Sequence, residues 1–201
     1  GGGRRRLLAP QEGPELVAAL VDRGDHQPHR HPDIDQNGFR ELERGLDRLR
    51  HRVVDAHSAL ARSYGVTVAV HVDGDTRAEV DVRRIERILR NLLVNAIEHS
   101  EGRPVDIYLQ GDATAVAVAV RDHGVGFEAS QAKQVFLRFW RADPARARTV
   151  GGTGLGLAIA MEDANLHGGW LTAWGRPGLG AQFRLTLPRK AGDVLETSPL
   201  P

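Results

Sequence analysis

Two asparagines four positions apart, Asn91 and Asn95, could present oxygen ligands from one face of a helix. Asparagine is a mediocre helix former, so two on the same face need a reason. One reading is ordinary solvated polar residues. The other is a pair of amide oxygens offered to hydrated Mg²⁺ and to phosphates, because Mg²⁺ prefers oxygen ligands and keeps several waters.

A second candidate follows a predicted strand, in the run Asp122-His123-Gly124-Val125-Gly126. A carboxylate at a strand end can accept a hydrogen bond from an amino group. The two glycines, Gly124 and Gly126, let the backbone approach a flat ring closely. Many tight turns share this pattern, so alone it is a weak indication of a binding pocket.

The third candidate is the glycine-rich run 151–157, which opens a predicted helix. Backbone N–H groups at the start of a helix bind phosphate oxygens, and the helix dipole assists. The run lacks the Lys-Ser/Thr ending of a P-loop and does not lie in a strand–helix–strand unit of a dinucleotide fold. A flexible connector is the alternative reading.

Aromatic and basic residues lie between the two glycine runs. Phe136, Phe139 and Trp140 are predicted on a short amphipathic helix, where core packing is their ordinary use. Arg141 begins a polar loop that also holds Arg146 and Arg148. Arginines beside a phosphate site can neutralise developing charge, whereas elsewhere they are solvated loop charges.

The elements that must position these residues follow from periodicity. Apolar residues spaced as on an amphipathic helix predict a helix over 82–99, capped by Asp81. Further helices are expected over 38–64 and 155–166, and strands over 66–72, 78–82, 105–110, 114–121, 170–174 and 182–187. One sheet with helices on one face makes a two-layer α+β sandwich.

The flanking segments carry less information. Residues 1–36, rich in proline, are predicted to be flexible, and the histidines His26, His29 and His31 fit a solvated linker better than a metal site. The stripe of the helix over 37–64 suits packing on a sheet, or a continuation of a dimerising helical hairpin. Residues 65–190 form the predicted domain, and 191–201 are expected to be a tail without pattern.

Composition sets further limits. The chain has 201 residues, enough for one domain with a core, and a net charge of +1, which predicts no nucleic-acid partner. It contains no cysteine, so disulfides and thiolate sites are excluded. No apolar run approaches the roughly 20 residues that span a bilayer. A start at Gly1-Gly2-Gly3 favours a fragment of a longer protein.

Together, the order and spacing of these motifs resemble the catalytic domain of sensor histidine kinases over about residues 46–189. Asn91–Asn95, Asp122–Gly126, Phe136–Phe139 and Gly152–Leu157 are similar to that family's N box, first glycine box, F box and second glycine box. The stretch 139–154 most resembles actinobacterial MtrB-type kinases. The resemblance implies a Bergerat-type ATP-binding fold, with a mixed sheet and helices on one face, and the cofactors ATP and Mg²⁺.

The resemblance also implies a role for each matching residue. Asn95 would hold the metal and Asn91 a phosphate or a metal-bound water, while Asp122 would receive the adenine amino group in a pocket shaped by Gly124 and Gly126. Arg141 would approach the γ-phosphate, and His99 would replace the usual contact next to Glu98. The remaining cofactor contacts implied are Phe136, Phe139, Gly152, Thr153, Gly154, Leu155, Gly156 and Leu157.

The implied reaction transfers the ATP γ-phosphate to a histidine. The family's acceptor histidine is followed by an acidic residue and, a few positions on, by a proline; none of the nine histidines here has that context. We therefore expect the acceptor on a separate dimerisation domain, with a response regulator as a further partner and a homodimer only in the full-length protein. The domain would be the cytoplasmic portion of a membrane-anchored sensor. A non-catalytic module of the same fold and an anti-sigma-type serine kinase are the alternatives.

Overall fold

The computed structural model describes residues 45–140 and 153–201. The predictions for residues 1–36, for Arg141 and for Gly152 therefore lie outside the described residues, as does the first part of the helix expected over 38–64. The described elements are, in chain order, α1 (Gly45–Ala56), α2 (Ser58–Ser63), β1 (Val68–Asp73), α3 (Val82–His99), β2 (Val105–Gly111), β3 (Ala115–Asp122), two 3₁₀ turns, η2 (Ala129–Gln131) and η3 (Gln134–Phe136), α4 (Gly156–Leu166), β4 (Trp170–Arg176) and β5 (Gly180–Pro188).

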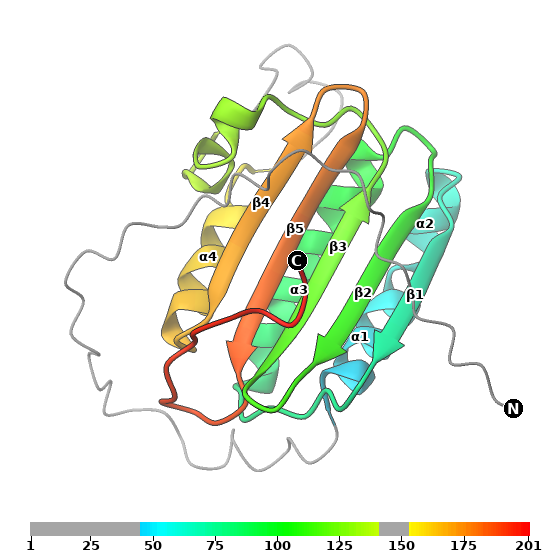
Figure 1. Cartoon of the computed structure of the whole chain (residues 1–201). Helices are drawn as coiled ribbons and strands as arrows, with labels where there is room; N and C mark the ends of the chain where they lie inside the picture. The colour runs from blue at the N-terminus through cyan, green and yellow to red at the C-terminus, as the bar shows by residue number, and fades with distance from the viewer. Residues whose placement is uncertain (1–44, 141–152) are drawn as a thin grey trace, which may run out of the picture.

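The strands form one mixed five-stranded sheet in the order β1-β2-β3-β5-β4. Strand β1 pairs parallel with β2, and all other neighbours are antiparallel. Helices α1, α3 and α4 lie on one face of this sheet, behind it in Figure 1. The structure thus confirms the predicted two-layer α+β sandwich with helices on one face.

Helix α3 is the centre of the core. Asp81 caps it as predicted, because its side chain accepts from the N–H groups of Arg83 and Arg84. The apolar stripe of α3 is buried against the inward side chains of β2, β3 and β5; it consists of Ile85, Ile88, Leu89, Leu92, Leu93, Ala96 and Ile97. Since burial of a large aliphatic side chain stabilises by about 1.5–3 kcal/mol, this stripe fixes α3 on the sheet.

Three local predictions were wrong. The first helix is divided at His57, whose ring Nδ1 contacts the carbonyl of Val53 at 2.8 Å while its N–H is shared between Val53 and Val54. No strand forms over 78–82; there Glu79 N–H donates to the carbonyl of Arg189 instead of joining the sheet. The helix expected around Phe136 and Phe139 is replaced by η2 and η3, and Phe139 lies beyond both.

The segment 191–201 packs on the open face of the sheet, across β4 and β5, as the red trace in Figure 1 shows. The Ser198 hydroxyl lies 3.0 Å from that of Thr186, and Arg184 Nη1 donates to the carbonyl of Leu200 at 2.7 Å. Leu195 is only 4% exposed, whereas its neighbour Val194 is 87% exposed. The tail is therefore part of the folded domain.

Substituting Leu195 with alanine should measure how firmly this tail is docked. We expect Leu195→Ala to lower the free energy of unfolding by roughly 2–4 kcal/mol, because it deletes a buried side chain. The matched control, Val194→Ala, removes an exposed side chain and should change stability by less than about 0.5 kcal/mol. Urea unfolding of both variants checks this, and equal stabilities would show that the tail is not docked.

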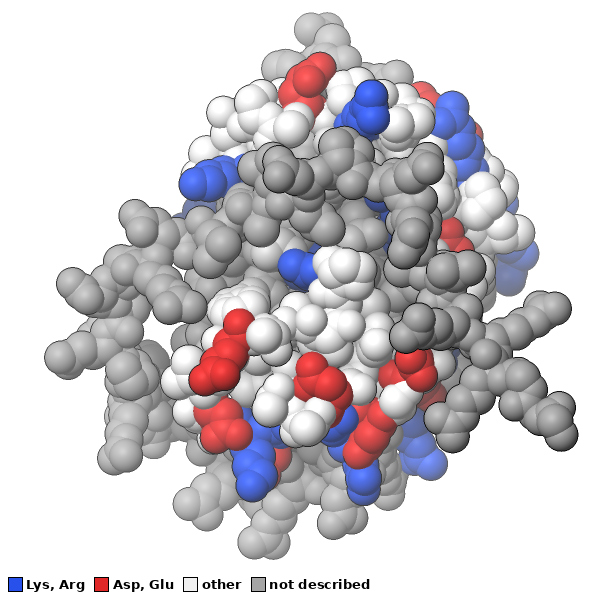
Figure 2. Space-filling model, in the orientation of Figure 1, with Lys and Arg blue, Asp and Glu red and all other residues white. Residues whose placement is uncertain are grey.

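Charges of both signs are interspersed at the surface. In Figure 2, described acidic and basic side chains alternate along the lower edge of the open face. The described part of this face thus carries no extended field of one sign. Within residues 45–140 and 153–201, no helix combines the length and apolar character needed to cross a membrane.

Candidate functional site

Helix α3 contacts both glycine-containing loops through hydrogen bonds. Near its middle, Asn91 Nδ2 donates to the carbonyl of Gly156, the first residue of α4, at 2.9 Å. At its end, the carbonyl of His99 accepts from the N–H of Val125, inside the first glycine loop, at 3.2 Å. Because an α-helix rises 1.5 Å per residue, the two contacts lie about 12 Å apart along α3, with Asn95 midway.

Asn95 is half-buried, and none of the described residues forms a hydrogen bond with its side chain. Asn91 differs, since one of its amide hydrogens is used by Gly156. The carboxamide oxygen of Asn95 is thus a neutral potential metal ligand without a protein partner in the described structure. These are the properties expected of a group that binds a hydrated divalent cation.

Asp122 lies at the end of β3 and is 1% exposed. Its Oδ1 accepts from the N–H groups of Gly124 at 3.0 Å and Ala181 at 3.2 Å, while no described residue donates to Oδ2. Burial raises the pKa of this carboxyl, an effect that the two hydrogen bonds and the nearby charges of His99 and Arg121 partly offset. Asp122 is therefore a fixed buried acceptor.

The two glycines after Asp122 serve the packing of the loop on the protein itself. A Cβ on Gly124 would lie 1.8 Å from the carbonyl oxygen of His99, and one on Gly126, at φ +64°, would lie 2.0 Å from that of Arg176. A side chain at either glycine would therefore collide with a backbone carbonyl of the protein. These glycines set the position of the loop, and any contact with a ring would come from its other side.

The second glycine loop is described from Thr153 onward, with Thr153 exposed and Leu157 packed against the core. Gly154 has φ +67°, and a Cβ there would lie 3.0 Å from Cα of Phe139, so glycine is needed. A Cβ on Gly156 would make only ordinary contact with Asn91. Leu155 makes no side-chain cap to α4, and within the described residues no hydrogen bond is seen from the first N–H groups of this helix, which is the kind of helix start that can bind an anion.

The two phenylalanines have different environments. Phe136 meets Phe183 edge-to-face, with ring centroids 6.1 Å apart, and so attaches its segment to the core. Phe139 is 72% exposed, has the left-handed φ of +62°, and donates its N–H to the carbonyl of Gly154 at 2.9 Å. A backbone hydrogen bond thus joins Phe139 to the second glycine loop, whereas the ring of Phe136 packs against the hydrophobic core.

Sequence reasoning missed a set of contacts that hold the first glycine loop. Arg103 Nη1 donates to the carbonyl of His123 at 2.6 Å, and His123 Nε2 lies 2.9 Å from Asp106 Oδ2 on β2. His71 on β1 contacts the other oxygen of Asp106 at 3.3 Å. These pairs join residues far apart in the sequence, so periodicity along one segment could not reveal them. Among the described residues, no histidine and acid group is arranged to hold a metal ion.

A second missed set joins α3 to α4. Asp163 on α4 is 1% exposed and accepts hydrogen bonds from Arg84 and Arg87 of α3. Burial alone would raise the pKa of Asp163, but the hydrogen bonds from the two arginines outweigh it and hold the pKa below its usual range. One sign of this contact was present in the sequence. Asp163 is an acidic residue on the side of the helix that also carries Ala160 and Ala164, where an apolar residue would be expected.

His167, which follows α4, is held in the neutral form. Its Nε2 accepts from the N–H of Asp81 at 3.0 Å, so Nδ1 carries the hydrogen and donates to the carbonyl of Asp163 at 2.7 Å. Burial lowers the pKa of His167, and protonation of Nε2 would break the bond to Asp81.

Stability should therefore fall as the pH drops below about 6.5, the ordinary pKa of histidine. In that range the unfolded chain takes up a proton at His167 while the folded chain resists it, until the pH passes below the folded pKa. For this one group, the free energy of unfolding changes by at most about 1.4 kcal/mol per pH unit. In urea unfolding at pH 5–8, His167→Gln should show a shallower pH dependence than the unchanged chain; parallel curves would contradict the neutral assignment.

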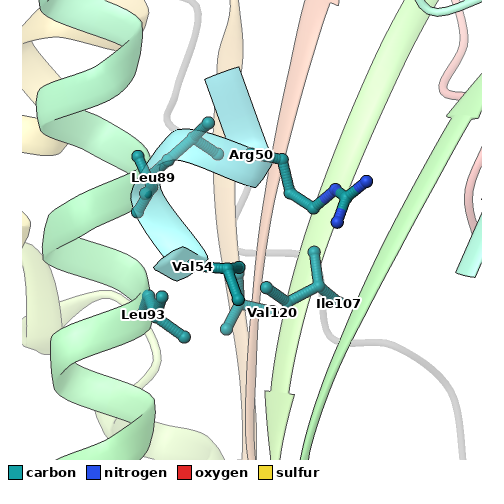
Figure 3. Close-up of a pocket in the computed structure, with 7 residues that line it drawn as sticks. Arg50, Val54, Leu89, Leu93, Ile107 and Val120 are labelled. Atoms are coloured by element: carbon teal, nitrogen blue, oxygen red, sulfur yellow. The ribbon is translucent and has the colours of Figure 1, made fainter. Parts of the chain in front are cut away.

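A narrow apolar hollow lies on the opposite side of α3 (Figure 3). Leu89 and Leu93 line it from α3, Arg50 and Val54 from α1, and Ile107 from β2. Residues 89 and 93 face about 160° away from position 91 on a helix, so this hollow is separate from the Asn91–Asn95 face. Arg50 is paired with Asp47, and the rest of the lining is apolar, which does not suit phosphate.

The fold and these contacts define a two-layer domain with two glycine loops joined by one polar helix face. Residues 80–191, more than half of the chain, match the family model described as histidine kinase-, DNA gyrase B- and HSP90-like ATPase. The chain belongs to this ATPase family, whose ATP-binding domain implies the use of ATP.

Similar proteins place the domain within that family. The chain is 57% identical over 143 residues to the sensor histidine kinase MtrB of Mycobacterium tuberculosis, covering 71% of this chain and 25% of that protein. It is 30% identical over 195 residues to the sensor-like histidine kinase SenX3 of Mycolicibacterium smegmatis, covering 90% of this chain and 51% of that protein. The chain thus spans only about a quarter to a half of these relatives.

Solved structures agree. The catalytic domain of histidine kinase ThkA superposes with a TM-score of 0.64 at 27% identity, covering 73% of this chain and 94% of that one. The mycobacterial sensor histidine kinase MprB gives 0.61 at 25% identity, covering 73% and 96%. The domain is therefore of the sensor histidine kinase catalytic type, as the order of its motifs indicated.

Proposed function

We propose that this domain binds ATP with Mg²⁺ and transfers the γ-phosphate to a histidine outside residues 1–201. The observation that carries the proposal is the single face of α3, where Asn95 lies midway between the loop after Asp122 and the start of α4. The spacing of about 12 Å between the two ends suits a molecule with a base at one end and phosphates at the other.

In this arrangement the Asp122 carboxylate accepts from the adenine amino group at the closed end of the site. The uncapped N-terminus of α4 and the backbone of residues 153–157 donate to the phosphates. Asn95 fits Mg²⁺ because its oxygen has no described protein partner, and Mg²⁺ when bound would neutralise phosphate charge. Arg141 and Gly152, outside the described residues, are proposed for the γ-phosphate end, and His99, exposed at the end of α3, for the nucleotide's edge.

The partners and location are proposed from the relatives. The structure of full-length ShkA, 26% identical over 77% of this chain, is a complex with AMPPNP. Histidine kinase ThkA has been solved in complex with the response regulator TrrA. By the likeness to ThkA we propose a response regulator as a partner. From the resemblance of the motifs to sensor histidine kinases we further propose an acceptor-histidine dimerisation domain, within a membrane-anchored dimeric sensor that presents this domain to the cytoplasm.

Phosphotransfer to an added acceptor tests the proposal. The chain is incubated with labelled ATP, Mg²⁺ and the separately produced dimerisation domain of the 57%-identical relative MtrB. We expect acid-labile label on the added domain, and none on this chain alone. Nucleotide binding without any label on the acceptor would favour a non-catalytic module, and acid-stable label would favour a serine kinase.

A further inference from the structure

Helices α3 and α4 are fastened together at three levels along their length, side by side behind the sheet in Figure 1. At the start of α4, Asn91 donates to the carbonyl of Gly156, and just after the end of α4 the N–H of Asp81 donates to His167. Between these, Asp163 is enclosed by two arginines of α3. The two helices carry different parts of the nucleotide site, since Asn95 is on α3 and the second glycine loop leads into α4.

The middle contact is the strongest of the three. Arg87 forms a fork on Asp163, with Nε 2.7 Å from Oδ2 and Nη2 2.7 Å from Oδ1, and Arg84 Nη1 adds a bond of 3.0 Å to Oδ1. The Asp163 side chain is 2% exposed. A bidentate guanidinium–carboxylate pair fixes both distance and orientation, which a single hydrogen bond does not.

Such a contact is more than a means of stability. Only the carboxylate of this pair is buried, since the Arg84 and Arg87 side chains are 42% and 41% exposed. Partly exposed ion pairs add little to stability, whereas the two parallel N–H···O bonds of the fork fix how α4 is oriented relative to α3. The residues that this orientation places are Asn95 on one side and Gly154 and Gly156 on the other.

We propose that Asp163, held by Arg87 and Arg84, is a positioning residue that sets the distance between the metal-binding face of α3 and the phosphate-binding loop at the start of α4. This inference rests on the proposed nucleotide site. It predicts that the ion pair controls affinity for the phosphate end of the nucleotide and leaves the adenine end unchanged, because Asp122 and its loop are attached to β3 and to the end of α3.

The test compares Asp163→Asn with Glu162→Gln. Glu162 is the neighbouring acid on α4, but its side chain is 56% exposed and pairs with the exposed Arg138. Dissociation constants for Mg·ATP and for adenosine are measured by NMR titration. We expect Asp163→Asn to weaken Mg·ATP binding roughly ten- to a hundredfold, the scale seen when a residue that orients a metal-binding group is lost. Adenosine binding should change less than twofold, and Glu162→Gln should match the unchanged chain.

A second readout does not depend on nucleotide. Hydrogen exchange of the amides at residues 153–160 should become faster in Asp163→Asn and stay unchanged in Glu162→Gln. If Asp163→Asn folds poorly, Arg87→Lys keeps the charge, loses the fork, and should show the same pattern in milder form. Unchanged Mg·ATP affinity, or equal loss for Mg·ATP and adenosine, would overturn the inference. Failure of the unchanged chain to bind either ligand would instead reject the nucleotide site, while the exchange data would still report on the ion pair.

Discussion

Replacing Asn95 with alanine is expected to abolish the Mg²⁺-dependent part of ATP binding. The side chain is half-buried on the face of α3 between the two loops, and its oxygen has no described protein partner that could compensate. Removal of this oxygen leaves the phosphates without the cation that neutralises them. We expect Mg·ATP affinity to fall at least about a hundredfold, the scale of losing a charge-neutralising group at a phosphate site.

The stability of the Asn95→Ala variant should be unchanged or slightly higher, because alanine is the better helix former and Asn95 holds no other element in place. The matched control is Asn165→Ala, which makes the same change at an exposed position of α4 and should bind like the unchanged chain. ATP titrations at fixed Mg²⁺ and in EDTA, compared with each other, give the part of the ATP affinity that depends on the metal. A variant that retains a normal Mg²⁺ enhancement would reject the assigned metal role.

The second large effect is expected for Asp122→Asn. The change is isosteric, and the new amide oxygen can still accept from Gly124 and Ala181. The amide nitrogen, however, replaces the free carboxylate oxygen and would face the adenine amino group, donor against donor. We expect affinity for ATP to fall about a hundredfold or more, because a hydrogen bond to a charged group is lost and a polar clash is created.

The same variant should fold at least as stably as the unchanged chain. Burial raises the pKa of Asp122, which means that the ionised carboxylate is held at a cost to stability near neutral pH, and a neutral amide removes that cost. Its preference for ATP over GTP should also shrink, since an amide donor can meet the guanine carbonyl. Asp73→Asn, an exposed acid at the end of β1, is the control. A stable Asp122→Asn protein with normal ATP affinity would show that adenine is recognised elsewhere.

Some of this structure was predictable because its causes are local. The apolar stripe of α3, its cap at Asp81 and the ending of α4 before Gly168-Gly169 depend on residues within one or two turns, and the structure has them as predicted. Strands β2 and β3 were also predicted close to their observed bounds; β2 alternates in burial, whereas β3 is buried at nearly every position. The break at His57 was not, because it depends on a side chain that competes for a backbone carbonyl within the helix.

The part of the site that could not be predicted depends on contacts between distant segments. Arg87 and Asp163 are 76 positions apart, and Arg103 holds the loop at His123 from another element. The sequence also could not show that the space beside Gly124 is filled by the carbonyl of His99. A motif indicates which residues do the chemistry, while the residues that position them appear only once the elements are packed.

Calorimetric titration of the chain with ATP, with and without Mg²⁺, would show whether the α3 face is a Mg·ATP site. We expect saturable binding of one nucleotide per chain that is stronger with Mg²⁺, and we expect Asn95→Ala to remove this difference. Absence of binding at millimolar ATP, or binding that Mg²⁺ does not affect, would contradict the assignment of the α3 face as a Mg·ATP site.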